Sequence, residues 1–183
     1  MIEVIAGNYV VERATGGDSF YCLLETIISQ LIAAKVADVL CARLLQLCDG
    51  ELKAERVQAL GLEKIKAIGL TKTKAQCIYD LSEAVVTRNL DLNKLRKKSD
   101  PEIIHELTKF KGIGRWSAEM FLLFGLEKPD VFSDLDGGLV RAVSHYYFQD
   151  NKPDQAQLQA VSKKWAPYRS YASFYLWKSL ERI

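Results

Sequence analysis

The sequence has few residues that could hold a metal ion or form a disulfide. Its four cysteines are spread over separate apolar segments without a C-x-x-C pair: Cys22, Cys41, Cys48 and Cys77. This pattern favours buried free thiols in a reducing compartment. No cysteine follows Cys77, which excludes a C-terminal iron–sulfur cluster. The two histidines, His105 and His145, are too few and too far apart for a zinc centre. We therefore expect no metal and no cofactor.

Long apolar runs and a strong charge of either sign are also lacking. No stretch is long enough to span a bilayer, and no signal-peptide pattern is found, so we expect no membrane association. The predicted location is cytoplasmic, associated with the nucleoid in a bacterium, or nuclear in a eukaryote. The formal net charge of +2 neither requires nor excludes nucleic acid, so a local patch would have to attract it.

The chain has few helix breakers. Four prolines and eleven glycines interrupt 183 residues, of which 49% are apolar, so the chain can bury a proper core. Apolar residues recur mostly at helical spacing and no strand is evident, which predicts an all-α protein. Helices are expected at about 19–31, 35–48, 54–59, 63–67, 72–88, 100–110, 116–124, 138–148 and, in one or two pieces, 157–182.

A glycine-containing hairpin between two of these helices is the most informative stretch. Ser99 and Glu102 form a capping box, with Pro101 in the first turn, and so begin the helix before it. Gly112 and Gly114 then permit backbone angles that a Cβ would forbid. Outward-facing amides at such a hairpin and at the following helix start suit a phosphate. By itself, Gly-Ile-Gly is equally consistent with a plain helical connector.

The residues around and after the hairpin resemble a known family. Gly112-Ile113-Gly114-Arg115-Trp116-Ser117-Ala118, followed by the acidic stretch 130–136, is similar to the helix-hairpin-helix superfamily of DNA base-excision glycosylases, and most similar to the 3-methyladenine DNA glycosylase II (AlkA-type) branch. Segments 28–31, 68–75, 167–172 and 176–177 also match, so that the resemblance covers roughly residues 18–180.

This resemblance implies a fold and an activity. The fold is one catalytic domain, residues 1–183, of two helical lobes with the active cleft between them. One lobe comprises about 1–34 and 115–183, and the other about 35–114. The implied activity is hydrolysis of the N-glycosidic bond of alkylated purines, such as 3-methyladenine and 7-methylguanine, in duplex DNA during base excision repair. The enzyme is expected to be a monomer that flips the damaged base out of the helix.

Asp136 matches the family's catalytic aspartate in its spacing from Gly114. An ionised carboxylate there would stabilise the oxocarbenium-like transition state and orient the attacking water. As an alternative, Asp136 is a helix N-cap, a role compatible with catalysis. The sequence departs from the family at Lys111, where proline is usual, at Ser133, and at the two glycines after Asp136. These departures leave Asp134 as a minor rival for the catalytic role.

Trp116 indicates the reaction subtype. In relatives that also cut the strand, a nucleophilic lysine stands at this place and forms a Schiff base, so we expect no lyase activity. Trp116 and Met120 are one helical turn apart and, with Trp177, are predicted to line the base pocket, where aromatic rings would stack on a cationic alkylated base. The aromatic residues could instead belong to the core. Lys178 stands where relatives often carry an aromatic residue, which leaves the lesion range open.

The remaining candidates contact DNA. Leu31 is predicted to fill the gap left by the flipped nucleotide, or else to be core at a helix end. Gln30 would contact the opposite base or hold its own loop. The hairpin should bind phosphates through its amides and nearby cations, namely Lys111, Gly112, Ile113, Gly114 and Arg115. Lys109 is a further candidate cation, and Lys72 and Lys74 form a comparable second cluster, although each of these surface cations could simply be solvated.

Two other functions fit the same residues. One is a glycosylase of this fold for uracil, hypoxanthine or an oxidised purine. The other is a non-catalytic helix-hairpin-helix DNA-binding module, in which Asp136 would only cap a helix.

Overall fold

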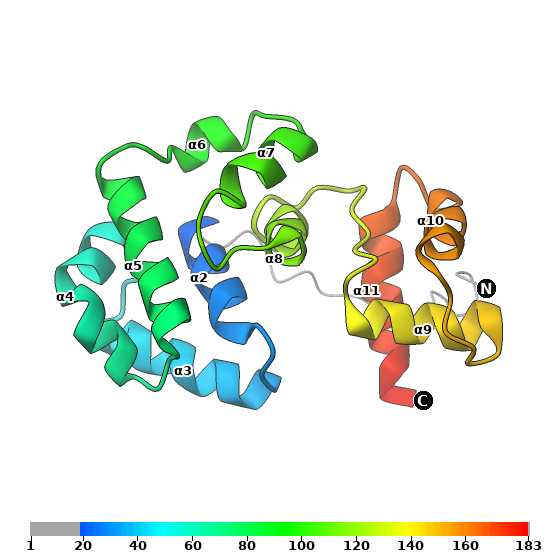
Figure 1. Ribbon diagram of the computed structural model, residues 1–183, viewed down its shortest axis with the longest axis horizontal. Helices are drawn as coiled ribbons and strands as arrows, with labels where there is room; N and C mark the ends of the chain where they lie inside the picture. The colour runs from blue at the N-terminus through cyan, green and yellow to red at the C-terminus, as the bar shows by residue number, and fades with distance from the viewer. Residues whose placement is uncertain (1–18, 183) are drawn as a thin grey trace. The chain divides into compact units, whose positions relative to one another are not determined.

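A computed structural model describes residues 19–182 of the chain (Figure 1). The turn predicted at residues 15–18 lies outside them. Within this range the chain forms helices and connecting segments and no strand, which confirms the all-α prediction. The helices are α2 (Ser19–Ser29), α3 (Ala34–Leu47), α4 (Ala54–Ala67), α5 (Lys72–Val86), α6 (Leu92–Leu95), α7 (Asp100–Leu107), α8 (Arg115–Met120), the π-helix η1 (Phe121–Gly125), α9 (Gly137–Phe148), α10 (Gln155–Lys163), α11 (Arg169–Ser179) and the 3₁₀ turn η2 (Leu180–Arg182).

The described chain forms two compact units, of which the first ends at Leu126. Helix α2 lies at the centre of this unit and contacts α3, α5, α8 and η1. It can do so because it is apolar on several sides, with Phe20, Leu23, Leu24, Ile27 and Ile28 each at most 3% exposed. A helix that is apolar nearly all round has to be buried by several neighbours.

Local signals begin, bend and end the helices of this unit. The capping box predicted from Ser99 and Glu102 is present, and the Ser99 N–H donates to Glu102 Oε2 at 2.9 Å. Gly61 has φ of 73°, which breaks α4 into the two short helical pieces expected from the sequence. Thr71 caps α5 by accepting from the Lys74 N–H.

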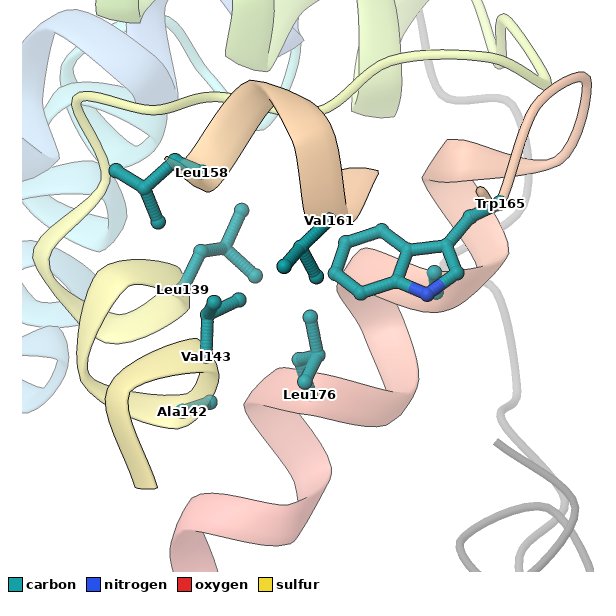
Figure 2. Packing of buried hydrophobic residues seen from close by; sticks show 8 residues of the cluster. Leu139, Ala142, Val143, Leu158, Val161, Trp165 and Leu176 are labelled. Carbon is teal, nitrogen blue, oxygen red and sulfur yellow. The ribbon is translucent and has the colours of Figure 1, made fainter. Parts of the chain in front are cut away.

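The second unit begins at Glu127 and is built from α9, α10 and α11. Its core contains Leu139 and Val143 of α9, Leu158 and Val161 of α10, and Leu176 of α11, which converge in Figure 2 together with Trp165. Each of these side chains is at most 7% exposed. Their burial is the main force that holds the three helices together.

The boundary between the two units differs from that of the predicted lobes. The prediction joined about 1–34 and 115–183 and separated about 35–114. The structure instead places α2 and α8 in the unit that ends at Leu126, because α2 is surrounded by α3, α5, α8 and η1 and α8 contacts α7. The cleft between two lobes stays a prediction.

All four cysteines are free and buried, as the sequence indicates. Burial raises the pKa of Cys22 and Cys77 to about 12 and that of Cys41 to about 11. Buried thiols with so little thiolate character are core residues. Between residues 19 and 182, no helix has the length and apolar character that crossing a membrane requires.

Candidate active site

Asp136 is the N-cap residue of α9, as the sequence allowed. Its Oδ1 accepts a hydrogen bond from the backbone N–H of Leu139 at 2.8 Å. The same oxygen accepts a second bond, also of 2.8 Å, from the indole Nε1–H of Trp177. Two donors from different helices fix the orientation of the carboxylate. Capping is thus confirmed, and a catalytic role stays a prediction.

Trp177 lies on α11, half-buried against the core of the second unit. Its ring centroid lies 6.0 Å from that of Phe174, at an interplanar angle of 60°. The hydrogen bond to Asp136 gives this tryptophan a function in the site that the sequence did not indicate. No local signal could have shown it, since the two residues are far apart in the chain. The hydrogen bond does not test whether Trp177 also lines a base pocket, which stays a prediction.

Gly138 makes room for the contact between Asp136 and Trp177. A Cβ on Gly138 would lie 3.1 Å from Asp136 Oδ1 and 3.1 Å from Trp177 Cδ1. A Cβ on the neighbouring Gly137 would meet nothing within 4 Å. The glycine pair after Asp136, unexpected at a helix start, thus has one member at which a Cβ would crowd both partners of the Asp136–Trp177 hydrogen bond.

The loop before Asp136 is pinned to the start of α11. Arg169 donates to both oxygens of Asp130, through Nε at 2.7 Å and Nη2 at 2.9 Å. Ser170 Oγ donates to the carbonyl of Lys128 and accepts from the N–H of Val131. The Arg169 guanidinium holds the pKa of Asp130 below its ordinary value. These contacts explain the segment 167–172 as the anchor of the Asp136 loop.

Asp134, the rival to Asp136, points to a different helix. Its Oδ2 accepts from Gln155 Nε2 at the start of α10, at 3.0 Å. The neighbouring Ser133 is fully buried. The hydrogen bond from Gln155 therefore ties the loop to α10, whereas Asp136 has the tryptophan partner.

The hairpin lies in the first unit and connects α7 to α8. It extends over residues 108–114, because α7 ends at Leu107, before the end expected at about residue 110. Gly112 has φ of 107°, and a Cβ on it would lie 3.0 Å from Cys77 Cβ on α5, so glycine is required there. Gly114, by contrast, does not use the backbone freedom expected of it. Its φ of −93° suits any residue, and a Cβ would meet nothing within 4 Å.

The other hairpin candidates are placed as follows. Lys111 and Gly114 are exposed, whereas Ile113 is buried. Lys111 borders a hollow of about 190 Å³ together with Lys72, Thr73 and Gln76 of α5. Arg115 Nε donates to the buried Glu119 at 2.7 Å on the same helix, which reduces its value as an independent phosphate ligand.

Gln30 and Leu31 lie at the end of α2 beside this hairpin. The Gln30 amide donates to the carbonyl of Gly112 at 2.9 Å and to Ser117 Oγ at 2.8 Å. Gln30 therefore holds its loop, one of the two alternatives. Leu31 is fully exposed with φ of 56°, so the alternative that it is core is wrong.

The two pocket candidates of α8 differ in exposure. Trp116 is half-buried, whereas Met120 is only 4% exposed and belongs to the interior of the first unit. No group of three His, Cys, Asp or Glu side chains between residues 19 and 182 is arranged to hold a metal.

Comparison with known proteins shows to which family the chain belongs. A model described as "HhH-GPD superfamily base excision DNA repair protein" matches residues 24–167. The chain belongs to the HhH-GPD superfamily. The match includes the hairpin and Asp136 and ends before α11, which carries Trp177.

Several HhH-GPD proteins resemble the chain over most of its length. Schizosaccharomyces pombe 3-methyladenine DNA glycosylase (Mag1), solved in complex with abasic DNA, is 26% identical with a TM-score of 0.88 over 98% of this chain and 89% of that one. A DNA-3-methyladenine glycosidase from Bacillus halodurans is 31% identical with a TM-score of 0.80 over 97% and 88%. Bacillus subtilis YfjP, named provisionally as a DNA-3-methyladenine glycosylase, is 32% identical over 88% of this chain and 59% of its own length. The chain spans about half to two thirds of the length of the curated relatives it matches first.

Replacement of Gly138 by alanine tests whether this HhH-GPD chain needs the space beside Asp136. Because the new Cβ would push Trp177 from Asp136, we expect the free energy of unfolding to fall by about 1–3 kcal/mol. The NMR signal of the Trp177 indole proton should move upfield as its hydrogen bond is lost. Gly137→Ala is the matched control, and its stability should be unchanged or up to about 1 kcal/mol higher. Equal behaviour of the two variants would contradict this account.

The Asp130–Arg169 pair predicts a pH-dependent stability. Asp130→Asn should lower the free energy of unfolding at neutral pH by about 1–2 kcal/mol. Since the pKa of Asp130 is depressed in the folded state, its contribution is fully present above the ordinary value of 3.8 and is lost as the pH falls through the lower folded-state value.

Thermal unfolding of wild type and Asp130→Asn over a falling pH series measures this effect. The gap in Tm between the two proteins should be constant above pH 3.8 and close below it. Glu181→Gln removes a more exposed pair with Lys178 and should change Tm little at any pH. A gap that persists in strong acid would show that Asp130 acts through packing instead of charge.

Proposed function

We propose that the chain is a monofunctional DNA glycosylase that hydrolyses the N-glycosidic bond of alkylated purines in duplex DNA, as a monomer and in base excision repair. The observation that carries this proposal is the Asp136 carboxylate, held on Oδ1 by the Leu139 N–H and the Trp177 indole in a chain of the HhH-GPD superfamily. The similarity to Mag1, whose structure contains abasic DNA, supports the choice of substrate class.

Hydrolysis begins with rotation of the damaged nucleotide out of the duplex, at a cost of roughly a few kcal/mol that is smallest for weakly paired bases. Leu31, exposed at the end of α2, would fill the space that the nucleotide leaves. The hairpin amides at 112–114 and the nearby Lys111 would hold the backbone phosphates.

Asp136 would then act on the flipped nucleotide. As the bond between base and sugar lengthens, positive charge develops on the sugar, and an ionised carboxylate beside it stabilises that charge and orients the attacking water. A carboxylate pre-oriented by two N–H donors need not reorganise during the reaction. N-alkylation makes the purine a better leaving group, so a strong general acid is not needed.

The proposed reaction ends at the abasic site. Trp116 occupies the position at which strand-cleaving relatives carry the lysine that forms a Schiff base, so this chain lacks that nucleophile. The product would be an intact strand with an abasic site.

Replacement of Asp136 tests the proposal on duplex DNA methylated at purines. Wild type should release free methylpurine, and strand breaks should appear only after hot alkali. Asp136→Asn should lower the single-turnover excision rate about 100-fold or more while it still binds abasic DNA. Asp134→Asn, an equally conservative change two residues away, should keep most of the activity.

Other outcomes separate the alternatives. Wild-type binding to abasic DNA without release of methylpurine would direct the search to uracil, hypoxanthine and oxidised purines. Excision unaffected by Asp136→Asn would overturn the catalytic assignment. DNA binding with no release from any lesion would leave a non-catalytic DNA-binding module. These interpretations require that each variant still folds, which thermal unfolding checks.

A further inference from the structure

The conformation of Leu31 is unfavourable by itself. The residue follows the last turn of α2 with φ of 56°, a left-handed backbone that β- and γ-branched residues seldom adopt. Its side chain is fully exposed to solvent and therefore buries no apolar surface. A leucine that has neither backbone preference nor burial in its favour has to be held in place by its surroundings.

Lys74 supplies much of this support. Its ammonium group donates to the carbonyl of Ile28 at 2.8 Å and to the carbonyl of Gln30 at 2.7 Å. In a longer helix these carbonyls would accept from residues four positions later, but α2 ends at Ser29. Lys74 thus takes the place of the missing helical N–H groups on both sides of the turn, as basic residues near helix C-termini often do.

The Lys74 ammonium group is committed to these carbonyls. No carboxylate among the described residues acts on it, and its partial burial lowers its pKa. Helix α5, on which it lies, contacts α2 and also packs against the hairpin, where Cys77 faces Gly112. The amide of Gln30 joins the same turn to the hairpin through the Gly112 carbonyl. The turn at 30–31 is therefore connected to α5 and to the hairpin by side-chain hydrogen bonds.

We propose that Lys74 is a positioning residue that holds the turn after α2 so that Leu31 projects from the protein at a fixed distance from the hairpin. This inference rests on the proposed function, in which Leu31 enters the duplex. It replaces the role considered for Lys74 from the sequence, a direct phosphate contact, because the ammonium group already binds two carbonyls. An aligned wedge would lower the cost of holding the nucleotide outside the helix.

Four variants separate positioning from phosphate binding. Lys74→Met keeps the apolar stem and loses the donors, whereas Lys74→Arg restores cationic donors. Lys111→Met serves as the reference for loss of a phosphate contact. Lys66→Met, an exposed lysine of α4, serves as the neutral control. DNA with 2-aminopurine beside the lesion reports unstacking, and excision is measured at saturating protein together with the salt dependence of binding.

Lys74→Met should lower both the 2-aminopurine signal and the single-turnover excision rate, the latter about tenfold or more. Its salt dependence should equal that of wild type, whereas Lys111→Met should reduce the slope by about 0.9. Lys74→Arg should recover most of the signal and rate. Unchanged flipping and excision in Lys74→Met, or a reduced salt slope like that of Lys111→Met, would overturn the inference.

Hydrogen exchange of the protein without DNA separates this inference from the proposed function. Amides of residues 30–32 should exchange faster in Lys74→Met than in wild type, and at the wild-type rate in Lys66→Met. If wild type releases no base, the proposed function fails and this measurement still decides whether Lys74 holds the turn. If Lys74→Met does not fold, Lys74→Gln takes its place. Unfolding of both would make Lys74 a general stability residue and would also overturn the inference.

Discussion

The two hydrogen bonds to Oδ1 of Asp136 are the constraint that the rest of the second unit has to satisfy. They join the beginning of α9 to a side chain of α11. Both bonds form where Gly138 leaves room for them, where the core of α9, α10 and α11 brings Trp177 close, and where Arg169 and Ser170 hold the preceding loop. A single carboxylate orientation thus depends on contacts made throughout this unit.

In the first unit, the corresponding constraint is the C-terminal end of helix α2. Helix α2 is buried along most of its length, but Leu31, the second residue after it, is fully exposed. The carbonyls exposed by the end of the helix need partners, and Lys74 provides them. Gln30 then connects the turn to the hairpin, where Gly112 allows the close approach of α5. Polar side chains, and not apolar packing, place Leu31.

These two arrangements share a physical logic. In each, a side chain of a second helix, which is itself fixed by a buried apolar core, donates hydrogen bonds that hold the site in one conformation. The bonds alone would be worth only about 1 kcal/mol each, which is too little to order a loop. The cores supply the stability, and the hydrogen bonds select one geometry from those that the cores would permit.

Local interactions are what the sequence by itself determined. Preferences of neighbouring residues for a local conformation can be recognised before the fold is known. They determine the all-α class, the capping box at Ser99, the break at Gly61 and the cap at Asp136. The motif around Gly112 and Asp136 also sufficed to indicate the HhH-GPD superfamily. The tertiary structure alone decided the partners of Asp136, Asp130 and Lys74, the exposure of Leu31, and the grouping of α2 and α8 with the first unit. Each of these depends on residues distant in the chain, and no periodicity or local propensity records which distant side chains will meet.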